Sequence, residues 1–332
     1  MKRYNVAVVG ATGLVGSKIL EILEEREFPI ENLNLLASKK SENAKVTFNK
    51  KEYKVKVLSE ESFDEDIDIA FFAAGGGISE KFVPIAAAKG IVAIDNSSVF
   101  RMNPEVPLLV PETNPQAIKD HKNIIANPNC STIQCMPPLK PILDKYGIKR
   151  IVFSTYQSVS GSGTMGLRDL DEGLVDFYPH SIRGNVLPHI DVFLENGYTK
   201  EEMKMIEETK KILENDQLKI TATAVRVPVR FAHSVSVNLE LESEFEIEDI
   251  KELMRNSPGI ILKDDIENGQ YPIPQDAEGR DEIFVGRIRR DFSLENGLNL
   301  WIVADNIRKG AALNAVQIAE LLIKKGDLGW LI

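Results

Sequence analysis

A short strand, a glycine-rich turn and a helix open the chain. Residues 6–9 form a continuous apolar run, typical of a strand that is buried on both faces. Gly10-Ala-Thr-Gly13-Leu-Val-Gly16 follows, and residues 17–25 have the apolar period of a helix. In this context the three glycines allow a tight turn, close approach of the backbone to a diphosphate, and close helix–strand packing. The spacing differs from the commoner G-x-G-x-x-G, and such turns also occur without a ligand, but strand, turn and helix in this order favour a dinucleotide site.

The end of the next predicted strand, residues 33–37, bears on the choice of dinucleotide. A fold that prefers NAD tends to place an acidic residue there to bind the ribose hydroxyls. Here the strand is followed by Ser38-Lys39-Lys40-Ser41. Two cations and two hydroxyls favour a 2′-phosphate, so we expect NADP. A solvated basic turn with no ligand is the alternative.

Polar residues follow later strands of the same sheet. We expect strands at residues 53–58, 67–73 and 91–95. Asp95-Asn96-Ser97-Ser98 ends the last of them, at the carboxyl edge where ligands of open α/β sheets bind. Arg101 follows in a proline-rich loop. An arginine here is either solvated or clamps an anion with its planar fork.

Cys130 stands where a strand turns into a helix. Residues 124–126 are strand-like, Asn127-Pro128 is a turn, and residues 131–143 have helical character. The N-terminus of a helix leaves backbone N–H groups unpaired and carries the positive end of the dipole. A thiol there loses its proton more easily, and the thiolate is a nucleophile. The alternative is a cysteine that is simply buried at the junction.

The second half of the chain has a different pattern. A long strand, residues 150–159, ends in the glycine-rich loop 160–166, and β-branched residues mark strands at 220–227 and 235–241. With a helix before that pair, this half is predicted to be an α+β domain with a mixed, largely antiparallel sheet. We therefore expect an α/β protein with two domains. The first is a Rossmann-type dinucleotide-binding domain, residues 1–128, completed by a C-terminal helical segment, 305–332. The second is a catalytic and dimerisation domain, residues 129–304.

Composition excludes several classes of partner. The formal net charge of −10 argues against nucleic acid, which requires a basic surface. Two cysteines support neither a disulfide framework nor a zinc site, so we expect no metal. No apolar run is long enough to span a membrane, and no signal-peptide pattern opens the chain. A cytoplasmic enzyme is the expectation.

Taken together, the motifs resemble those of aspartate-β-semialdehyde dehydrogenase over nearly the whole chain. They are Gly10-Ala-Thr-Gly13-Leu-Val-Gly16, Asp95-Asn-Ser-Ser98 with Arg101, Asn127-Pro-Asn-Cys130-Ser-Thr, Gln157-Ser-Val-Ser160-Gly161-Ser-Gly163, Glu201-Glu-Met-Lys204, Arg226-Val-Pro-Val and Ala232-His233-Ser. The Asn-Pro-Asn-Cys-Ser-Thr form is similar to the branch found in Gram-positive bacteria and their relatives. The resemblance implies reversible reduction of aspartyl-4-phosphate by NADPH to aspartate semialdehyde and phosphate, in the synthesis of lysine (through diaminopimelate), threonine and methionine.

The resemblance also implies roles for individual residues. Cys130 would form a thioacyl intermediate, His233 would act as general acid and base, and Gln157 would orient the acyl group. Arg226 would bind the substrate α-carboxylate, Glu201 the α-ammonium, and Lys204 and Arg101 the phosphate. Asn129 would also contact substrate. The implied cofactor-binding residues are Gly10, Thr12, Gly13, Leu14, Val15, Gly16, Lys40, Ser41, Ser160, Gly161 and Asn306. Many relatives carry arginine where this chain has Lys40, so its preference for NADP is less firmly implied.

Two other functions compete with this one. N-acetylglutamyl-phosphate reductase is also a two-domain NADP enzyme with a cysteine nucleophile, but its substrate has an acylated amine, for which Glu201 would have no purpose. A catalytically silent NADP-binding regulator is the other alternative. Members of the resembled family are homodimers or, less often, tetramers.

Overall fold

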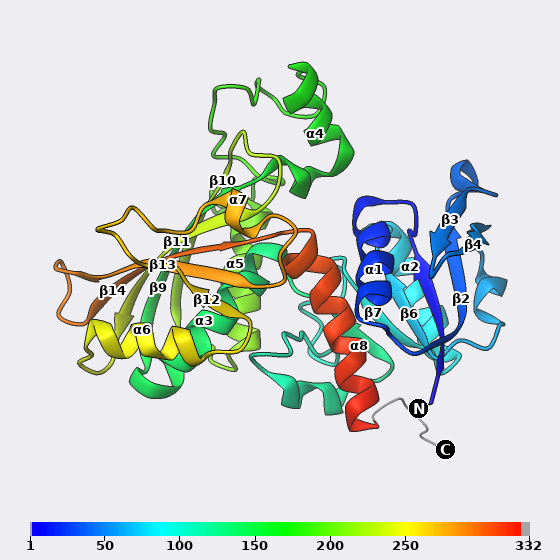
Figure 1. Ribbon diagram of the computed structural model, residues 1–332, viewed down its shortest axis with the longest axis horizontal. Helices are drawn as coiled ribbons and strands as arrows, with labels where there is room; N and C mark the ends of the chain where they lie inside the picture. The colour runs from blue at the N-terminus through cyan, green and yellow to red at the C-terminus, as the bar shows by residue number, and fades with distance from the viewer. Residues whose placement is uncertain (1, 327–332) are drawn as a thin grey trace. The chain divides into compact units, whose positions relative to one another are not determined.

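The computed structural model describes residues 2–326, and these form two compact units. One unit runs to Pro128 and resumes at Ala311, whereas the other is Asn129–Gly310 (Figure 1).

The first unit contains a six-stranded parallel sheet with the strand order β5-β2-β1-β6-β7-β8. Its strands are β1 (Tyr4–Val9), β2 (Ile30–Ala37), β5 (Lys56–Val57), β6 (Ile69–Phe72), β7 (Val92–Asp95) and β8 (Ile124–Ala126). Its helices are α1 (Leu14–Glu25), α2 (Gly76–Ala88) and α8 (Asn314–Lys325). From β1 the chain builds the sheet outward first through β2 and β5 and then in the opposite direction through β6, β7 and β8. The switch point, where ligands of such sheets bind, therefore lies between β1 and β6.

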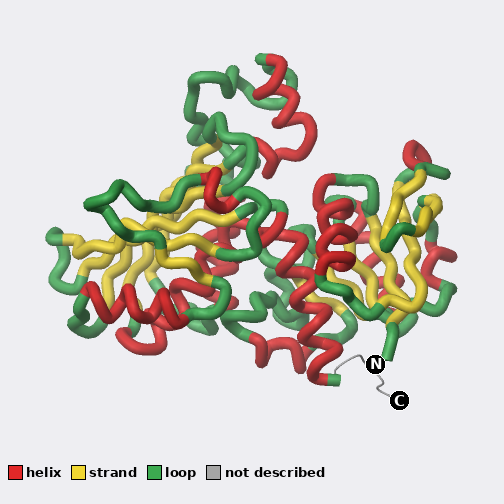
Figure 2. The backbone as a smooth tube through the Cα atoms, viewed as in Figure 1, coloured by secondary structure: helices red, strands yellow, loops and turns green. Residues whose placement is uncertain are grey.

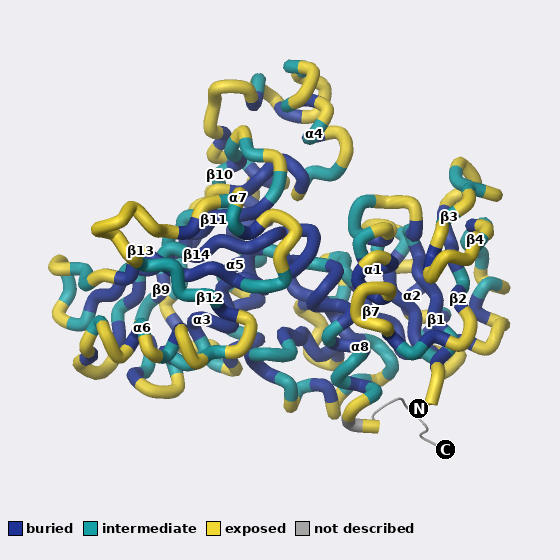
Figure 3. The backbone as a smooth tube through the Cα atoms, viewed as in Figure 1, coloured by how far each residue is buried: buried dark blue, intermediate teal, exposed yellow. Residues whose placement is uncertain are grey.

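Helices cover both faces of this sheet. Side chains of α1 and α8 share one apolar cluster with Val6 and Val8, whereas side chains of α2 share another with Ala7 and Val9. Because successive strand residues point to opposite faces, β1 is buried on both sides, as its continuous apolar run predicts. Strands β1, β6 and β7 are accordingly buried along nearly their whole length (Figure 3).

The glycine turn after β1 leaves no room for side chains. A Cβ atom on Gly16 would lie 2.1 Å from the carbonyl oxygen of Gly10. Gly10 has a φ of +88°, and a Cβ atom there would lie 2.6 Å from the carbonyl oxygen of Ala73. Both positions therefore require glycine, one for helix–strand packing and the other for the turn.

One predicted strand, residues 53–58, was wrong. The chain changes sheets at Val55, whose side chain is only 2 % exposed. Before it, β4 (Lys51–Lys54) pairs with β3 (Lys45–Phe48) in a separate hairpin, and after it β5 joins the parallel sheet. The alternation of apolar and polar residues in one run of sequence does not show that its two ends pair with strands of different sheets.

The second unit contains a mixed six-stranded sheet with the order β10-β9-β11-β14-β13-β12 (Figure 2). The strands are β9 (Ile148–Gln157), β10 (Lys219–Arg226), β11 (His233–Leu241), β12 (Ile260–Leu262), β13 (Ile283–Asp291) and β14 (Gly297–Ala304). The three inner pairs are antiparallel and the two outer pairs are parallel. The helices are α3 (Cys130–Tyr146), α4 (Gly163–Glu172), α5 (Lys200–Ile212), α6 (Ile247–Asn256) and the short α7 (Pro274–Ala277). The predicted fold class, α/β with a largely antiparallel second sheet, is confirmed.

The sheet of the second unit has two unlike faces. Helix α3 packs on β9, β11 and β14, and α5 packs on both α3 and β10. On β11, Val235, Val237 and Leu239 are 0 % exposed, whereas the alternating residues Ser236 and Asn238 are partly exposed. One face therefore carries the helices and the apolar core, and the other is more polar and open.

Residues 305–310, which the sequence analysis assigned to the first domain, belong to the second unit. The Asp305 carboxylate accepts the N–H of Gly279 at 2.8 Å, and Asn306 Oδ1 accepts the N–H of Ala232 at 3.1 Å. A single-turn π-helix, Arg308–Leu313, then leads into α8.

No helix within residues 2–326 combines the length and the apolar character that a membrane span requires.

Candidate active site

Cys130 is the first residue of α3, and Asn129 caps this helix. The Asn129 side chain accepts the N–H of Ser131 at 2.9 Å, which satisfies one of the unpaired donors of the first turn. Cys130 is partly exposed, whereas Cys135 is fully buried. Burial raises the pKa of the Cys135 thiol, so that sulfur stays protonated. Of the two free cysteines, Cys130 is the one placed to react.

Three predicted site residues stand side by side at one end of the second sheet. Arg226 of β10 pairs in register with Gln157 of β9. Ser234 of β11 pairs with Tyr156, so His233 lies level with Gln157 on the other side. Arg226, Gln157 and His233 thus occupy neighbouring strands in one row, and they are 5 %, 2 % and 0 % exposed.

The backbone favours one tautomer of His233. Its Nδ1 accepts the backbone N–H of Ser158 at 3.0 Å, so the neutral ring carries its proton on Nε2. Burial, together with the nearby charge of Arg226, holds the pKa of His233 well below its ordinary value, and the ring is neutral at pH 7. Nε2 is buried and has no partner within the part of the chain that the structure describes. This buried N–H group could therefore donate a hydrogen bond to a bound ligand.

Arg226 also has unused bonding capacity. Its Nη1 donates to the carbonyl oxygen of Ser158 at 2.7 Å, but its buried Nε has no acceptor among the described residues. Gly161 leaves space beside both side chains, because a Cβ atom there would lie 2.9 Å from Arg226 Nη1 and 3.3 Å from His233 Nε2. A buried cation with a spare donor suits an anionic group of a ligand.

Glu201 of α5 links the predicted substrate-binding residues. Its Oε1 accepts from Asn129 Nδ2 at 2.9 Å and from Gln157 Nε2 at 3.1 Å. Its Oε2 lies 3.1 Å from Lys204 Nζ, which also pairs with Asp191 at 2.8 Å. Burial acts to raise the pKa of Glu201, but the Lys204 charge and the two amide donors outweigh it, and the pKa is lowered. The buried carboxylate is therefore ionised at neutral pH.

The structure separates the predicted cofactor residues into two groups. Ser160, Gly161 and Asn306 lie in the second unit near His233, where Asn306 Oδ1 accepts from Ser158 Oγ at 2.9 Å and from Ser160 Oγ at 3.1 Å. The rest lie in the first unit, in the turn between β1 and α1, at the start of α1 and in the turn after β2. Ser158 was not predicted, and no spacing in the sequence indicates that it holds His233.

A pocket of about 410 Å³ in the first unit is lined by several of these residues. Its lining includes Gly10, Thr12, Gly13, Ser38, Lys39 and Phe82. Thr12 Oγ1 and Ser41 Oγ lie 3.0 Å apart beside it. Leu14, Val15 and Gly16 form the first turn of α1, whose unpaired N–H groups and positive dipole end suit a diphosphate. Lys39 lines the pocket whereas Lys40, the residue predicted, follows it on an exposed 3-10 turn.

Arg101 belongs to the first unit and is only 7 % exposed. Its Nε donates to the carbonyl oxygen of Asn127 and its Nη2 to that of Asn96, both at 2.9 Å. It is thus anchored to the loops after β7 and β8 rather than solvated. Among residues 2–326 there is no cluster of three or more histidine, cysteine or acidic side chains that could hold a metal ion.

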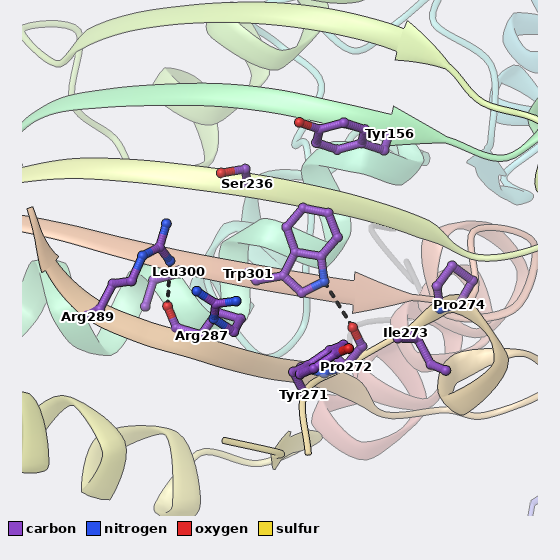
Figure 4. A pocket seen from close by; sticks show the side chains of 10 residues that line it. All are labelled: Tyr156, Ser236, Tyr271, Pro272, Ile273, Pro274, Arg287, Arg289, Leu300 and Trp301. Atoms are coloured by element: carbon purple, nitrogen blue, oxygen red, sulfur yellow. Dashed lines mark hydrogen bonds between the residues drawn. The ribbon is translucent and has the colours of Figure 1, made fainter. Parts of the chain in front are cut away.

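A second pocket, of about 380 Å³, lies on the open face of the second sheet (Figure 4). Tyr156 and Trp301 line it, with their ring centroids 5.4 Å apart, and Trp301 Nε1 donates to the carbonyl oxygen of Pro272 at 3.0 Å. Tyr156 precedes Gln157 on β9, so the two side chains point to opposite faces of the sheet. This pocket is therefore not part of the row formed by Arg226, Gln157 and His233.

Two family models match the chain. Residues 5–121 match the semialdehyde dehydrogenase NAD binding domain, and residues 139–309 match the semialdehyde dehydrogenase dimerisation domain. The first match indicates a nicotinamide dinucleotide as cofactor, and the second indicates a homodimer.

Curated relatives agree with these models over nearly full length. The chain is 55 % identical to the aspartate-semialdehyde dehydrogenase of Aquifex aeolicus over 97 % of this chain and 99 % of the relative. It is 46 % identical to that of Bacillus subtilis over 96 % and 97 %.

Solved structures share the fold. Aspartate semialdehyde dehydrogenase II of Vibrio cholerae, complexed with ASA, superposes with a TM-score of 0.94 at 46 % identity, over 98 % of this chain and 99 % of that one. The Candida albicans enzyme with NADP has a TM-score of 0.79 at 26 % identity, over 98 % and 99 %. The chain belongs to the aspartate-semialdehyde dehydrogenase family.

Proposed function

We propose that the chain catalyses the reversible, NADP-dependent reductive dephosphorylation of L-aspartyl-4-phosphate to L-aspartate 4-semialdehyde, in the synthesis of lysine, threonine and methionine. One observation carries the proposal: an accessible cysteine opens a helix beside a buried ionised glutamate, in the unit that also holds a buried arginine with a spare donor. A nucleophile with sites for an ammonium and a carboxylate fits an acyl group on an amino acid.

Cys130 supplies the covalent chemistry. Its thiolate attacks the acyl carbon, the carbon–oxygen bond to phosphate breaks, and a thioester forms on the sulfur. Such a covalent intermediate divides one difficult reaction step into two easier ones. NADPH supplies a hydride when it is bound. Backbone N–H groups at the start of α3 are suited to stabilise negative charge on the acyl oxygen.

His233 serves as the proton carrier. The Ser158 N–H favours the form with the proton on Nε2, which can donate to sulfur or to oxygen. The opposite tautomer would place a proton on Nδ1, where Ser158 Oγ lies at 2.9 Å as an acceptor. Accepting a proton at Nε2 requires this second form, in which Ser158 Oγ replaces the Ser158 N–H as the partner of Nδ1.

Arg226 and Glu201 select the substrate in this proposal. The unused Nε of Arg226 suits the α-carboxylate, and the ionised Glu201 suits the α-ammonium. The remaining donors of Lys204 are proposed to bind the phosphate. An N-acetylated substrate has no ammonium for Glu201, which disfavours the acetylglutamyl-phosphate reductase alternative.

The first unit fits a dinucleotide and favours one that carries a 2′-phosphate. Any side chain at Gly10 or Gly16 would fill the turn that must approach the diphosphate. Ser38 and Lys39 directly follow β2, and none of the described residues lining the pocket is acidic. We therefore propose NADP. A reducing cytoplasm suits an enzyme that requires Cys130 as a free thiol.

We propose that two copies pair through the open face of the second sheet. The match to a dimerisation domain spans this sheet, and its open face carries Tyr156, 40 % exposed, together with the partly exposed Trp301. Tyr271 and Ile273 are also exposed there, at 44 % and 38 %. An open sheet face that exposes aromatic side chains among polar ones, and that both copies use, is typical of a twofold interface.

Cys130→Ser should lower kcat by on the order of 10³-fold or more, because a serine hydroxyl is a far weaker nucleophile than a thiolate. NADPH affinity should stay within about twofold, since Cys130 does not hold the dinucleotide in this proposal. Phosphate-dependent reduction of NADP⁺ with aspartate semialdehyde measures the first quantity, and fluorescence titration measures the second. Cys135→Ala is the control, and iodoacetamide should inactivate it as it inactivates the wild type. Turnover by Cys130→Ser, or activity that survives alkylation, would refute the thioacyl route.

Arg226→Leu should raise KM for aspartate semialdehyde at least about 30-fold, because removing one partner of a buried charge pair typically weakens binding by about 2–5 kcal/mol. Arg230→Leu removes an exposed arginine of the next loop and should leave KM near normal. Unchanged KM in Arg226→Leu would mean that the carboxylate binds elsewhere. Wild-type turnover of N-acetylglutamate 5-semialdehyde at a comparable rate would favour the alternative function.

Lys39→Glu and Lys40→Glu should each raise the Kd of NADPH by about tenfold or more while barely changing that of NADH, because only NADPH carries the 2′-phosphate. Lys50→Glu places the same charge change on an exposed turn of the same unit and serves as the control. Equal affinity of wild type and both variants for NADPH would remove the basis for choosing NADP.

Tyr156→Glu should convert the dimer to a monomer at micromolar concentration, because it buries a charge in the proposed interface. Phe292→Glu changes an aromatic side chain that is 95 % exposed on the β13–β14 turn, and it should leave the dimer intact. Light scattering after gel filtration distinguishes the two states. A Tyr156→Glu protein that remains dimeric would place the interface on another surface.

A further inference from the structure

Helix α5 presents a stripe of three side chains to the start of α3. Glu201, Met205 and Glu208 are spaced four and three residues apart, so they share one face of α5. Glu201 bonds the side chain of Asn129, and Met205 Sδ accepts from Thr132 Oγ1 at 3.6 Å. The substrate site proposed above uses Glu201 but not Glu208.

Glu208 is a buried carboxylate with a specific contact. It is 1 % exposed, and its Oε2 accepts the backbone N–H of Asn129 at 2.7 Å. Burying a carboxylate is costly unless hydrogen bonds compensate for lost water, and a bond to an ionised acceptor is stronger than a neutral one. Because this bond is made at the residue before Cys130, it can influence where the nucleophile lies.

The contact completes a helix cap from outside the helix. In a capping box, the third residue of the helix returns a side-chain bond to the backbone N–H of the N-cap residue. The third residue of α3 is Thr132, whose hydroxyl is directed to Met205 instead. Glu208 of α5 provides the missing bond to the N-cap N–H of Asn129.

As a result, Asn129 is fixed at three polar atoms. Its N–H is bonded to Glu208, its Nδ2 to Glu201 and its Oδ1 to the N–H of Ser131. Two of these three bonds come from α5, on side chains two helical turns apart. The backbone of Cys130, the next residue, is thereby tied to the helix that carries Glu201.

We propose that Glu208 is a positioning residue for Cys130: its bond to the Asn129 N–H sets the nucleophile in register with the Glu201 site. This inference rests on the proposed function. Glu208 itself contacts neither substrate nor cofactor in this account. Its loss should therefore impair the chemical step and spare binding.

The test compares Glu208→Ala, Glu208→Gln and Glu208→Asp with Glu207→Ala, an exposed glutamate on the same helix. Glu208→Ala should lower kcat about 10- to 100-fold, because displacing a reacting group by about 1 Å costs up to that much. KM for aspartate semialdehyde and Kd for NADPH should stay within about twofold, since Arg226, Glu201 and the first unit are unchanged. Glu207→Ala should match the wild type in all three quantities.

The conservative variants separate positioning from simple stabilisation. Gln keeps an oxygen that can accept the Asn129 N–H, so Glu208→Gln should recover most of the lost kcat. Asp keeps the charge, but its side chain is one methylene shorter and reaches the Asn129 N–H less well. The kcat of Glu208→Asp should therefore be lower than that of Glu208→Gln. This order also provides the test if Glu208→Ala does not fold. Melting temperatures are measured alongside and should not follow the order of kcat.

Two results would overturn the inference. One is a kcat of all folded Glu208 variants within about twofold of wild type, whatever their melting temperatures. The other is a Gln variant that is no more active than Asp or Ala. A wild type without turnover on aspartate semialdehyde would instead refute the proposed function, so the two failures are distinguishable.

Discussion

The bonds that hold Asn129 connect the two parts of the chemistry in the second unit. Glu208 and Glu201 bind its backbone and its side-chain amide, and Asn129 in turn caps the helix that begins with Cys130. A nucleophile is useful only if the acyl carbon arrives at the right distance and angle, and positional errors of an ångström are costly. Two hydrogen bonds to Asn129 thus connect the helix of the nucleophile with the helix of the proposed ammonium site.

Neighbouring charges also set the ionisation states of two buried side chains in the second unit. Lys204 keeps Glu201 ionised despite its burial, while burial and Arg226 keep His233 neutral. The two outcomes are opposite because a nearby cation stabilises the ionised form of a carboxylate and destabilises the protonated form of an imidazole. Together they supply a fixed anion, a fixed cation and a neutral proton carrier within one unit. The proposed reaction needs all three.

Much of this could be predicted from the sequence, because several features are local. The geometry of the turn Gly10–Gly16 depends on its own glycines, because a Cβ atom at Gly10 or Gly16 would clash with backbone oxygen atoms. The strand–helix junction placed Cys130 at a helix start, which the structure also has. Features that depend on distant partners were less accessible. The run 53–58 has the alternation of one strand, yet Val55 enters the core and divides it. Ser158 lies inside a quoted motif, but the sequence does not indicate its bond to His233, and Glu208 lies outside every quoted motif. Both bonds are made to residues far along the chain.

The sequence by itself determined the family, the two-part α/β architecture and the position of Cys130 at a strand–helix junction, because each depends on short patterns of glycines, apolar residues and polar motifs. Only the tertiary structure decided which tautomer of His233 is favoured and what holds Asn129. Those properties arise from hydrogen bonds between residues separated by tens of positions, such as Asn129 and Glu208. The physical reason is that electrostatics and hydrogen bonding depend on distance in space, and separation along the chain does not specify that distance.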